Sequence, residues 1–221
     1  MAETGITRKA TPEPLAAAPI VDAYLRAALL AAEEVVGAAG LATLLRQIGL
    51  AQLVNNYPPD LPVASGQVTF GDYSTLCVGL LTSFGSAGKS MMLRIGRLSA
   101  KYALLRQSEV FKVAELNTVK TLPRDQQLRF GLEILQAGYR TLMPELKLRI
   151  EDHGEAWAYV AETCPMCIGY AAHEPLCWAF DGVLQEAAYV QSGKIFAVKE
   201  VACRAQGDPA CVWEISKQPS E

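Results

Sequence analysis

The stretch that decides the fold runs from Lys199 to Trp213 and reads KEVACRAQGDPACVW. Cys203 and Cys211 are equidistant from Gly207, so a hairpin that turns at this glycine places the two thiols opposite each other, near enough to share an ion. Glu200 lies three residues before Cys203. Residues three apart on a regular strand face opposite sides, so this carboxylate and this thiol converge only through a bulge or a twisted strand.

Further cysteines cluster upstream of this hairpin. Five of the six in the chain follow residue 163, namely Cys164, Cys167, Cys177, Cys203 and Cys211. Zinc accepts thiolate and carboxylate ligands in a tetrahedron, and four protein ligands leave no position open for water. The pattern therefore predicts a structural zinc site, whose negative charge we expect backbone N–H groups or Lys199 to offset. The alternatives are a disulfide between Cys203 and Cys211, or buried thiols that act as small apolar residues.

The spacing of four of these residues resembles a known zinc-binding signature. Cys177, Glu200, Cys203 and Cys211, with Gly207 before the last cysteine, are spaced as in the 4-vinyl reductase domain of phenol-sensing activators. In that family the Cys, Glu, Cys and Cys positions are the zinc ligands. The resemblance implies the same role for these four residues.

A longer set of segments is similar to one subgroup of that family, the J-type 4-vinyl reductases of bacteriochlorophyll synthesis. The segments are CPMC (164–167), PLC (175–177), GVLQE (182–186), SG (192–193) and CRAQGD (203–208). The resemblance covers residues 145–216 well and is weak upstream. It implies a mixed α/β ligand-binding fold, related to a subunit of vesicle-tethering complexes and usually homodimeric.

The CPMC run leaves the ligand set open, because the phenol sensors lack it. Cys164 and Cys167 can grip an ion from a tight turn, so a zinc ribbon of Cys164, Cys167, Cys203 and Cys211 is the rival to the family set. An iron–sulfur cluster is a further alternative. We favour Cys177, Glu200, Cys203 and Cys211.

Hydrophobic periodicity predicts an α+β fold. Apolar residues recur at helical spacing in 21–36, 41–48, 122–143 and 176–191, and two helices within 70–105 are separated by Phe84–Gly88. Alternation predicts a hairpin over 146–161, and two more strands over 195–203 and 211–216. We expect N-terminal helices packed on an antiparallel sheet of about four strands, ordered ββαββ. The domain spans 19–217, with a flexible tail at 1–18 and the zinc-binding part at 145–216.

Four aromatic residues of the C-terminal part are candidates for a ligand pocket between sheet and helices, namely Trp157, Tyr159, Trp178 and Phe180. Ordinary core packing is the competing interpretation for each. An apolar pocket with few polar groups suits flat hydrophobic ligands such as tetrapyrroles or phenols.

Composition and motifs exclude several functions. A net charge of −3 with scattered Lys and Arg argues against nucleic acid. Charged residues at Arg26, Glu33 and Glu34 interrupt the most apolar region, so we expect no membrane-spanning helix, and the polar start of the chain predicts a cytoplasmic protein. The run SFGSAGKS (83–90) follows a helix where a phosphate-binding loop needs a strand, and is interpreted as a helix break at a close contact. No GxGxxG follows a strand, so the chain shows no means of holding a nicotinamide donor.

These observations and the resemblance lead to one hypothesis and two alternatives. The first is a zinc-stabilised carrier of a hydrophobic small molecule, a tetrapyrrole of the bacteriochlorophyll precursor type, which it presents to a partner enzyme. The second is a divinyl (proto)chlorophyllide 4-vinyl reductase whose cofactor another subunit delivers. The third is a sensor module for small aromatic ligands.

Overall fold

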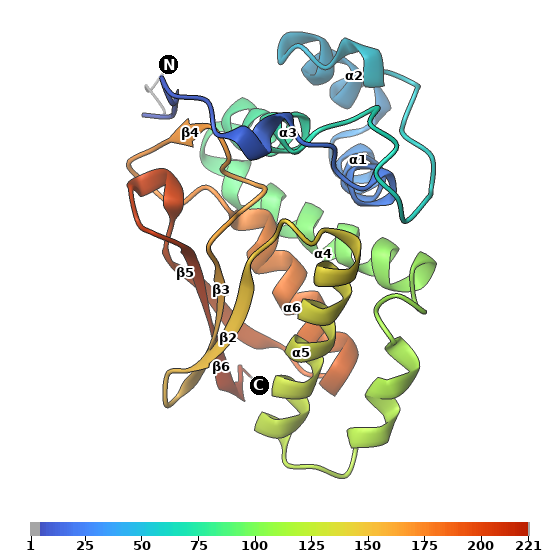
Figure 1. The fold of residues 1–221 in the computed structure, drawn as a ribbon, viewed down its shortest axis with the longest axis vertical. Helices are drawn as coiled ribbons and strands as arrows, with labels where there is room; N and C mark the ends of the chain where they lie inside the picture. The colour runs from blue at the N-terminus through green and yellow to red at the C-terminus, as the bar shows by residue number, and fades with distance from the viewer. Residues whose placement is uncertain (1–4, 221) are drawn as a thin grey trace.

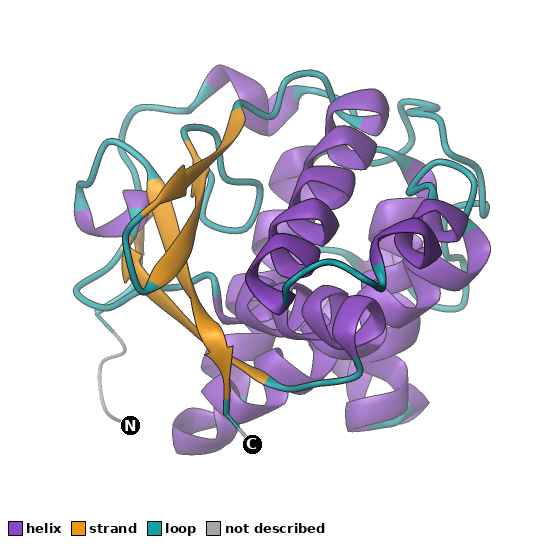
Figure 2. Cartoon of the chain, turned by 90° about the horizontal axis from the view of Figure 1, so that it is seen from below, coloured by secondary structure: helices purple, strands orange, loops and turns teal. Residues whose placement is uncertain are grey.

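The computed structural model describes residues 5–220 and has a mixed α+β fold with antiparallel sheets, as the sequence predicts. Helices gather on one face of the larger sheet (Figures 1 and 2). In spatial order the strands of this sheet are β2 (Leu148–Asp152), β3 (Ala156–Ala161), β6 (Cys211–Pro219) and β5 (Phe196–Ala202). A separate pair of two-residue strands is formed by β1 (Thr7–Arg8) and β4 (Tyr170–Ala171).

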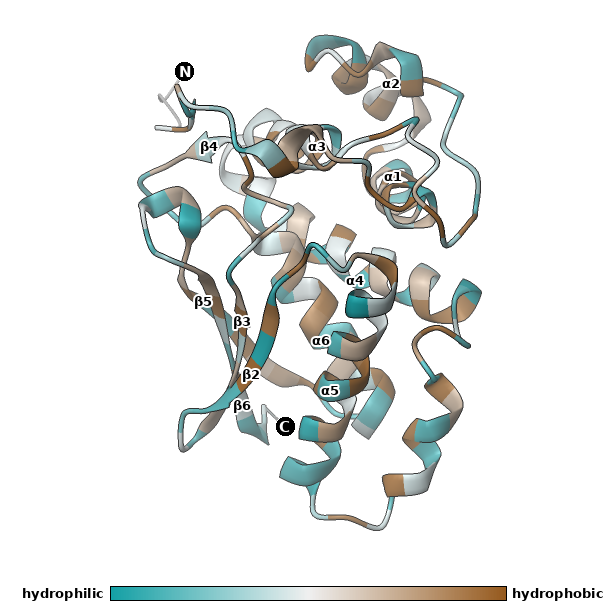
Figure 3. Ribbon diagram, in the orientation of Figure 1, coloured by the Kyte–Doolittle hydropathy of each residue, from teal (hydrophilic) through white to brown (hydrophobic). Residues whose placement is uncertain are grey.

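The helices lie close to the ranges that the hydrophobic pattern predicts. They are α1 (Asp22–Val36), α2 (Ala38–Gln47), α3 (Phe70–Ser83), α4 (Gly88–Arg106), α5 (Arg124–Leu142) and α6 (Trp178–Ser192). Short 3-10 helices are η1 (Pro14–Ala17), η2 (Ala51–Leu53), η3 (Gly85–Ala87), η4 (Val113–Val119) and η5 (Arg204–Gln206). Apolar and polar segments alternate along α5 (Figure 3), whose buried face includes Leu128, Leu132, Leu135 and Tyr139.

Local sequence explains where several helices begin and end. Thr69 and Asp72 form a reciprocal capping box at the start of α3, because the Thr69 hydroxyl accepts from the Asp72 N–H and the Asp72 carboxylate accepts from the Thr69 N–H. Gly37, with a φ of 78°, separates α1 from α2. The run 83–90 is the helix break expected from its small residues, since a Cβ on Gly88 would lie 2.1 Å from the Leu81 carbonyl oxygen.

Close packing of α4 against α6 fixes the centre of the molecule. A Cβ on Gly96 of α4 would lie 1.8 Å from the Ala179 carbonyl oxygen, and a Cβ on Gly182 of α6 would lie 2.1 Å from the Leu93 carbonyl oxygen. Only glycine permits two backbones to approach this closely. This contact sets the position of the start of α6, where Cys177 lies.

An aromatic cluster joins the helices to the sheet. It comprises Tyr24 on α1, Tyr139 on α5, Phe180 on α6, Tyr159 on β3 and Trp213 on β6. Neighbouring ring centroids lie between 4.6 Å, for Phe180 and Trp213, and 6.0 Å, for Tyr139 and Phe180. Pairs of this kind contribute about 0.5–1.5 kcal/mol each beyond their buried area.

Residues 5–18, which the sequence predicts to be a flexible tail, contact the C-terminal part. Thr7 and Arg8 pair with Ala171 and Tyr170, and the Arg204 guanidinium lies 3.0 Å from the Glu13 carboxylate. The first four residues of the expected tail lie outside the described residues.

Within residues 5–220, no single helix is long and apolar enough to cross a membrane. The pair α1 and α2 together meets the length and composition, with a bend of 119° between them.

Candidate metal centre

Four separate segments bring five cysteines to one buried point beside the sheet. Cys164 and Cys167 lie in the loop after β3, Cys177 precedes the first residue of α6, Cys203 follows β5, and Cys211 begins β6. Each of the five is at most 1% exposed. Cys77, the sixth cysteine, is buried in α3 outside this cluster.

The ligand atoms form two groups that share two cysteines. One consists of Cys177, Glu200, Cys203 and Cys211, the set favoured from the sequence, and the other of Cys164, Cys167, Cys177 and Cys211. Within each group all ligand atoms lie within 4.8 Å of one another. The zinc ribbon of Cys164, Cys167, Cys203 and Cys211 is not among the groups found in the described residues. All six candidate ligands nevertheless lie in one place.

A bulge brings Glu200 and Cys203 to the same side of the sheet. Glu200 pairs with Trp213 across the β5–β6 ladder, but Ala202 pairs with Val212, so the register shifts by one residue between them. The extra residue reverses the alternation of side chains. Convergence of the two groups requires this bulge, as the sequence spacing indicates, and the structure contains it.

Glu200 is a buried carboxyl with an open coordination position. Its Oε2 atom accepts a hydrogen bond of 3.0 Å from the Cys177 N–H, while its Oε1 atom has no hydrogen-bond partner within residues 5–220. Burial, together with the nearby thiolates of Cys203 and Cys164, raises the pKa of Glu200 to about 10. A divalent cation favours the ionised carboxylate instead, so this carboxyl is suited to a metal site.

The neighbouring thiols also shift one another's pKa values. Burial, followed by hydrogen bonds to the other thiols, raises the pKa of Cys177 well above its ordinary value. For Cys203 the contact with Cys167 raises the pKa, but hydrogen bonds from Cys177 and Cys211 lower it to about 7. Because like charges this close cannot all persist without a cation, the cluster favours bound metal over five free thiolates.

Sulfur separations fit a tetrahedral ion. The Sγ atom of Cys177 lies 3.4 Å from that of Cys164, 3.8 Å from that of Cys211 and 3.9 Å from that of Cys203. Ligands at about 2.3 Å from a tetrahedral zinc lie about 3.8 Å apart. The donor set and its spacing therefore fit zinc.

Backbone amides and an arginine offset the negative charge. The Arg204 N–H donates to Cys211 Sγ over 3.3 Å, and the Cys177 N–H donates to the Glu200 carboxylate over 3.0 Å. The expected role of Lys199 is wrong, because Lys199 alternates with Glu200 on β5, so the two side chains point to opposite faces. The half-buried Arg204 guanidinium lies near Cys167 and Cys164. Burial lowers the pKa of Arg204, but the ion pair with Glu13 and, to a smaller extent, these two cysteines raise the pKa above its ordinary value.

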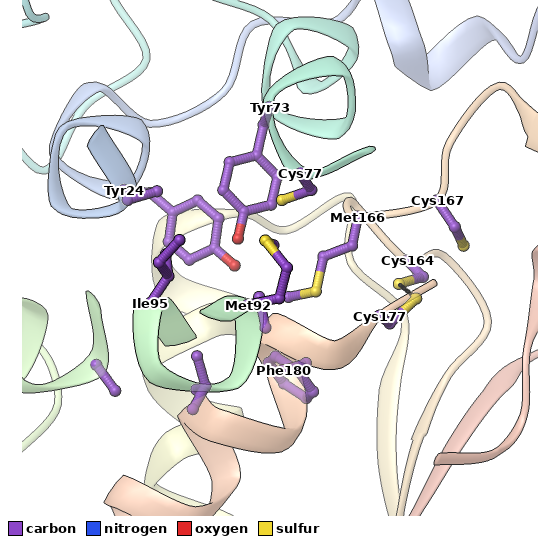
Figure 4. Close-up of a cluster of buried hydrophobic side chains, with 14 of the residues drawn as sticks. Tyr24, Tyr73, Cys77, Met92, Ile95, Cys164, Met166, Cys167, Cys177 and Phe180 are labelled. Atoms are coloured by element: carbon purple, nitrogen blue, oxygen red, sulfur yellow. Dashed lines mark hydrogen bonds between the residues drawn. The ribbon is translucent and has the colours of Figure 1, made fainter. Parts of the chain in front are cut away.

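A small apolar cavity of about 10 Å³, room for about one water molecule, adjoins the cysteine cluster. Its lining comes from α1, α5, α6, the sheet and the CPMC loop, and consists of Tyr24, Tyr139, Leu146, Leu148, Ala161, Cys164, Pro165, Met166, Phe180 and Trp213. Met166 lies between the cysteines and the hydroxyls of Tyr24 and Tyr73 (Figure 4). Cys164 belongs to both the cavity wall and the cluster, so the two features are in direct contact.

The four predicted pocket residues have different positions. Phe180 lines the cavity, and the buried Tyr159 packs on Phe180 with ring centroids 5.4 Å apart. The Trp157 ring lies beneath the Lys217 ammonium, 4.2 Å from its centroid, and the Trp178 indole donates a 2.9 Å hydrogen bond to the Pro175 carbonyl. These two tryptophans do not line this cavity.

Sequence reasoning missed cavity residues from distant helices. Tyr24 and Tyr139 appear in the sequence only as members of helical stripes, and Trp213 only as a strand residue. Their burial follows from periodicity, but no local signal indicates that the stripes of α1 and α5 face the same space.

Comparisons with known proteins support the family indicated by the cysteines. The family model of the 4-vinyl reductase domain matches residues 157–217, a segment that contains all six candidate ligands. This match supports that family for the C-terminal part and does not separate the J-type subgroup from other members. No curated protein sequence matches the chain.

Solved structures with a similar fold are H-NOX proteins. An H-NOX protein from S. oneidensis in the Fe(II)NO state has a TM-score of 0.51 at 13% identity, with 86% of this chain and 97% of that chain covered. A structure that probes heme distortion in the H-NOX family has a TM-score of 0.52 at 11% identity, covering 91% and 97%. The phenol-responsive sensory domain of the transcription activator PoxR, with phenol, has a TM-score of 0.43 at 16% identity, covering 67% and 75%. The H-NOX similarities show a shared fold.

Proposed function

We propose that this protein is a zinc-stabilised binding module for a hydrophobic small molecule. The observation that carries the proposal is the small apolar cavity whose wall continues into the cysteine cluster through Cys164. Ligand pockets are concave and mostly apolar, with a few polar groups that orient the ligand. Tyr159, which packs on the cavity residue Phe180, has a buried hydroxyl without a hydrogen-bond partner among the described residues.

The metal site serves structure in this proposal. Zinc held by Cys177, Glu200, Cys203 and Cys211 has no open position for water, so it joins the start of α6 to the β5–β6 hairpin without acting on a substrate. Phe180, two residues into α6, and Trp213, two residues into β6, both line the cavity. The ion thus fixes the two elements that shape the ligand site.

For the ligand we propose a tetrapyrrole, a bacteriochlorophyll precursor that the module carries to a partner enzyme. Support comes from the J-type resemblance, and the fold shared with a structure that probes heme distortion in the H-NOX family agrees with it. At about 10 Å³ the cavity is far smaller than the roughly 300–1,000 Å³ typical of ligand pockets. A tetrapyrrole therefore requires the CPMC loop or α1 to move outward.

A second candidate is a sensor of small aromatic molecules. The observation that favours it is the small size of the cavity, because a single aromatic ring needs a smaller outward movement of the cavity walls than a tetrapyrrole does. The CPMC loop offers a route for the signal, since Pro165 and Met166 line the cavity between two cysteines of the cluster.

Ligand titration with paired variants tests the binding site. Ala161→Leu places three carbon atoms in the cavity, whereas Ala158→Leu on the same strand places them against the small cluster of Ala158, Val160 and Ala210 on the opposite face. Both substitutions overpack a buried site, at about 1–3 kcal/mol. We expect divinyl protochlorophyllide or phenol to quench tryptophan fluorescence in the wild type and in Ala158→Leu, and to bind at least tenfold more weakly to Ala161→Leu.

Equal affinity in both variants would contradict the cavity as the site. Cys211 pairs with Ala161 across the sheet, so the metal content of both variants shows whether Cys211 still binds the ion. Saturation at one molecule per chain by divinyl protochlorophyllide would favour the carrier, and the same result with phenol would favour the sensor.

We also propose that the module acts as a cytoplasmic homodimer and needs a partner to support reduction of a vinyl group. The family resemblance supports the dimer, and the absence of a GxGxxG motif in the sequence supports the need for a partner. Light scattering of the purified protein tests the dimer. Reduction of a divinyl tetrapyrrole by the isolated chain with a nicotinamide donor would instead establish an autonomous reductase.

A further inference from the structure

The cysteine cluster contains more ligands than one tetrahedral ion can use. Zinc takes four protein ligands in a closed site, but five thiols and one carboxyl converge here. A structural zinc at the family set leaves Cys164 and Cys167 as surplus groups. Both residues are 1% exposed, and their sulfur atoms lie within 4.8 Å of those of Cys177 and Cys211.

The two groups divide these six ligands in a specific way. Cys164 and Cys167 belong to one group only, Glu200 and Cys203 belong only to the other, and Cys177 and Cys211 belong to both. Each group alone has the four ligands of a tetrahedral site. The shared pair lies 3.8 Å apart, the length of a tetrahedral edge at zinc–sulfur bonds of about 2.3 Å.

We propose that the cluster binds two thiophilic divalent ions, zinc in the cell, bridged by the thiolates of Cys177 and Cys211. Cys164 and Cys167 complete the first ion, and Glu200 and Cys203 complete the second. This proposal rests on the metal site of the proposed function and adds a second ion to it. Two tetrahedra that share an edge place their ions about 3 Å apart.

Charge permits a second ion. A single divalent ion on four ionised ligands leaves two negative charges at this buried site, and two ions on all six ionised ligands leave the same two, so the second ion adds no net charge. The remaining charge is within reach of the Arg204 N–H on Cys211 Sγ and the Cys177 N–H on Glu200. Buried charges require this kind of pairing.

Sulfur spacing also distinguishes this centre from an iron–sulfur cluster. In such clusters each iron carries one or two cysteines and inorganic sulfide separates the irons, so a cysteine sulfur has at most one other cysteine sulfur as close as thiolates on one ion. Here Cys177 Sγ lies 3.4 Å from Cys164 Sγ, 3.8 Å from Cys211 Sγ and 3.9 Å from Cys203 Sγ. Contacts this short match shared coordination of one ion.

Native mass spectrometry and cadmium NMR of the full chain test the proposal. The reduced wild type loaded with zinc should carry two ions, and the cadmium-loaded protein should show two signals that split each other through the bridging sulfurs. Cys164→Ala/Cys167→Ala should lose one ion and one signal. Cys77→Ala, a buried cysteine outside the cluster, is the matched control and should keep both.

The possible results separate the two metal proposals. One ion in the wild type, two signals without mutual splitting, or two ions retained by Cys164→Ala/Cys167→Ala would each overturn the bridged pair and leave the single structural zinc standing. No ion would overturn both. Acid-labile sulfide with iron in the purified protein would also overturn the bridged pair.

Discussion

The glycine contact between α4 and α6 predicts a large effect from a single methyl group. Gly96→Ala places a Cβ atom 1.8 Å from the Ala179 carbonyl oxygen and 2.7 Å from the carbonyl carbon, both of which belong to backbone that cannot rotate away. The helices must separate, and overpacking of this kind costs about 1–3 kcal/mol or more. Alanine gains about 1 kcal/mol over glycine in a helix, which offsets only part of the loss. Because the contact is with backbone, the cost lies at the upper end of this range, and we expect the free energy of unfolding to fall by about 2 kcal/mol net.

Urea denaturation followed by circular dichroism measures this change, and Gly40→Ala provides the control. Gly40 is also within a helix, α2, but its Cβ would meet nothing closer than the Val36 side chain at 3.8 Å. Gly40→Ala should therefore raise the urea midpoint slightly, whereas Gly96→Ala lowers it. Because α6 carries Cys177 at its start, Gly96→Ala should also release zinc more readily to a chelator. If both variants shift the midpoint upward, the close contact between α4 and α6 does not exist.

Other variants test the electrostatics and the cavity. Burial raises the pKa of Asp181 to about 7. The folded protein therefore binds this proton more tightly than the unfolded chain, and stability falls as pH rises from about 4 to 7. Asp181→Asn should flatten that decline, with a gain in the free energy of unfolding at pH 8 of up to about 4 kcal/mol. Thermal melts of the wild type and the variant across this pH range measure the change. Parallel curves of stability against pH would contradict the raised pKa of Asp181. Phe180→Ala should destabilise the fold by about 3–5 kcal/mol, because Phe180 contacts Tyr139, Tyr159 and Trp213. The same variant enlarges the cavity, so it should strengthen binding of the larger of two homologous ligands, as fluorescence titration would show.

Much of the fold follows from sequence periodicity. The stripe of Leu128, Leu132, Leu135 and Tyr139 predicts α5 to within two residues at its start, because one buried face and Pro123 define the helix locally. The hairpin β2–β3 follows from alternation and the turn after Asp152. Contacts between elements that are distant in the sequence are harder to predict. Nothing local indicates that Gly96 touches the backbone of Ala179, or that residues 7–8 add a strand beside Tyr170.

For the candidate metal centre, the sequence likewise predicts the ligand residues but not how they are arranged. Cysteine spacing identifies the candidate ligands, since a thiol cluster is rare without a common cause. The bulge that places Glu200 beside Cys203 is a property of the β5–β6 register, which spacing cannot supply. The sequence predicts a rival set in which Cys164 and Cys167 join Cys203 and Cys211, whereas the structure groups Cys164 and Cys167 with Cys177 and Cys211.

Elemental analysis of the purified chain, reduced and expressed without metal supplementation, tests the central claim most directly. Convergence of the buried thiols with the Glu200 carboxylate predicts at least one equivalent of zinc per chain, retained through dialysis and released when the protein unfolds. A chain that folds with less than a tenth of an equivalent of any transition metal would contradict it.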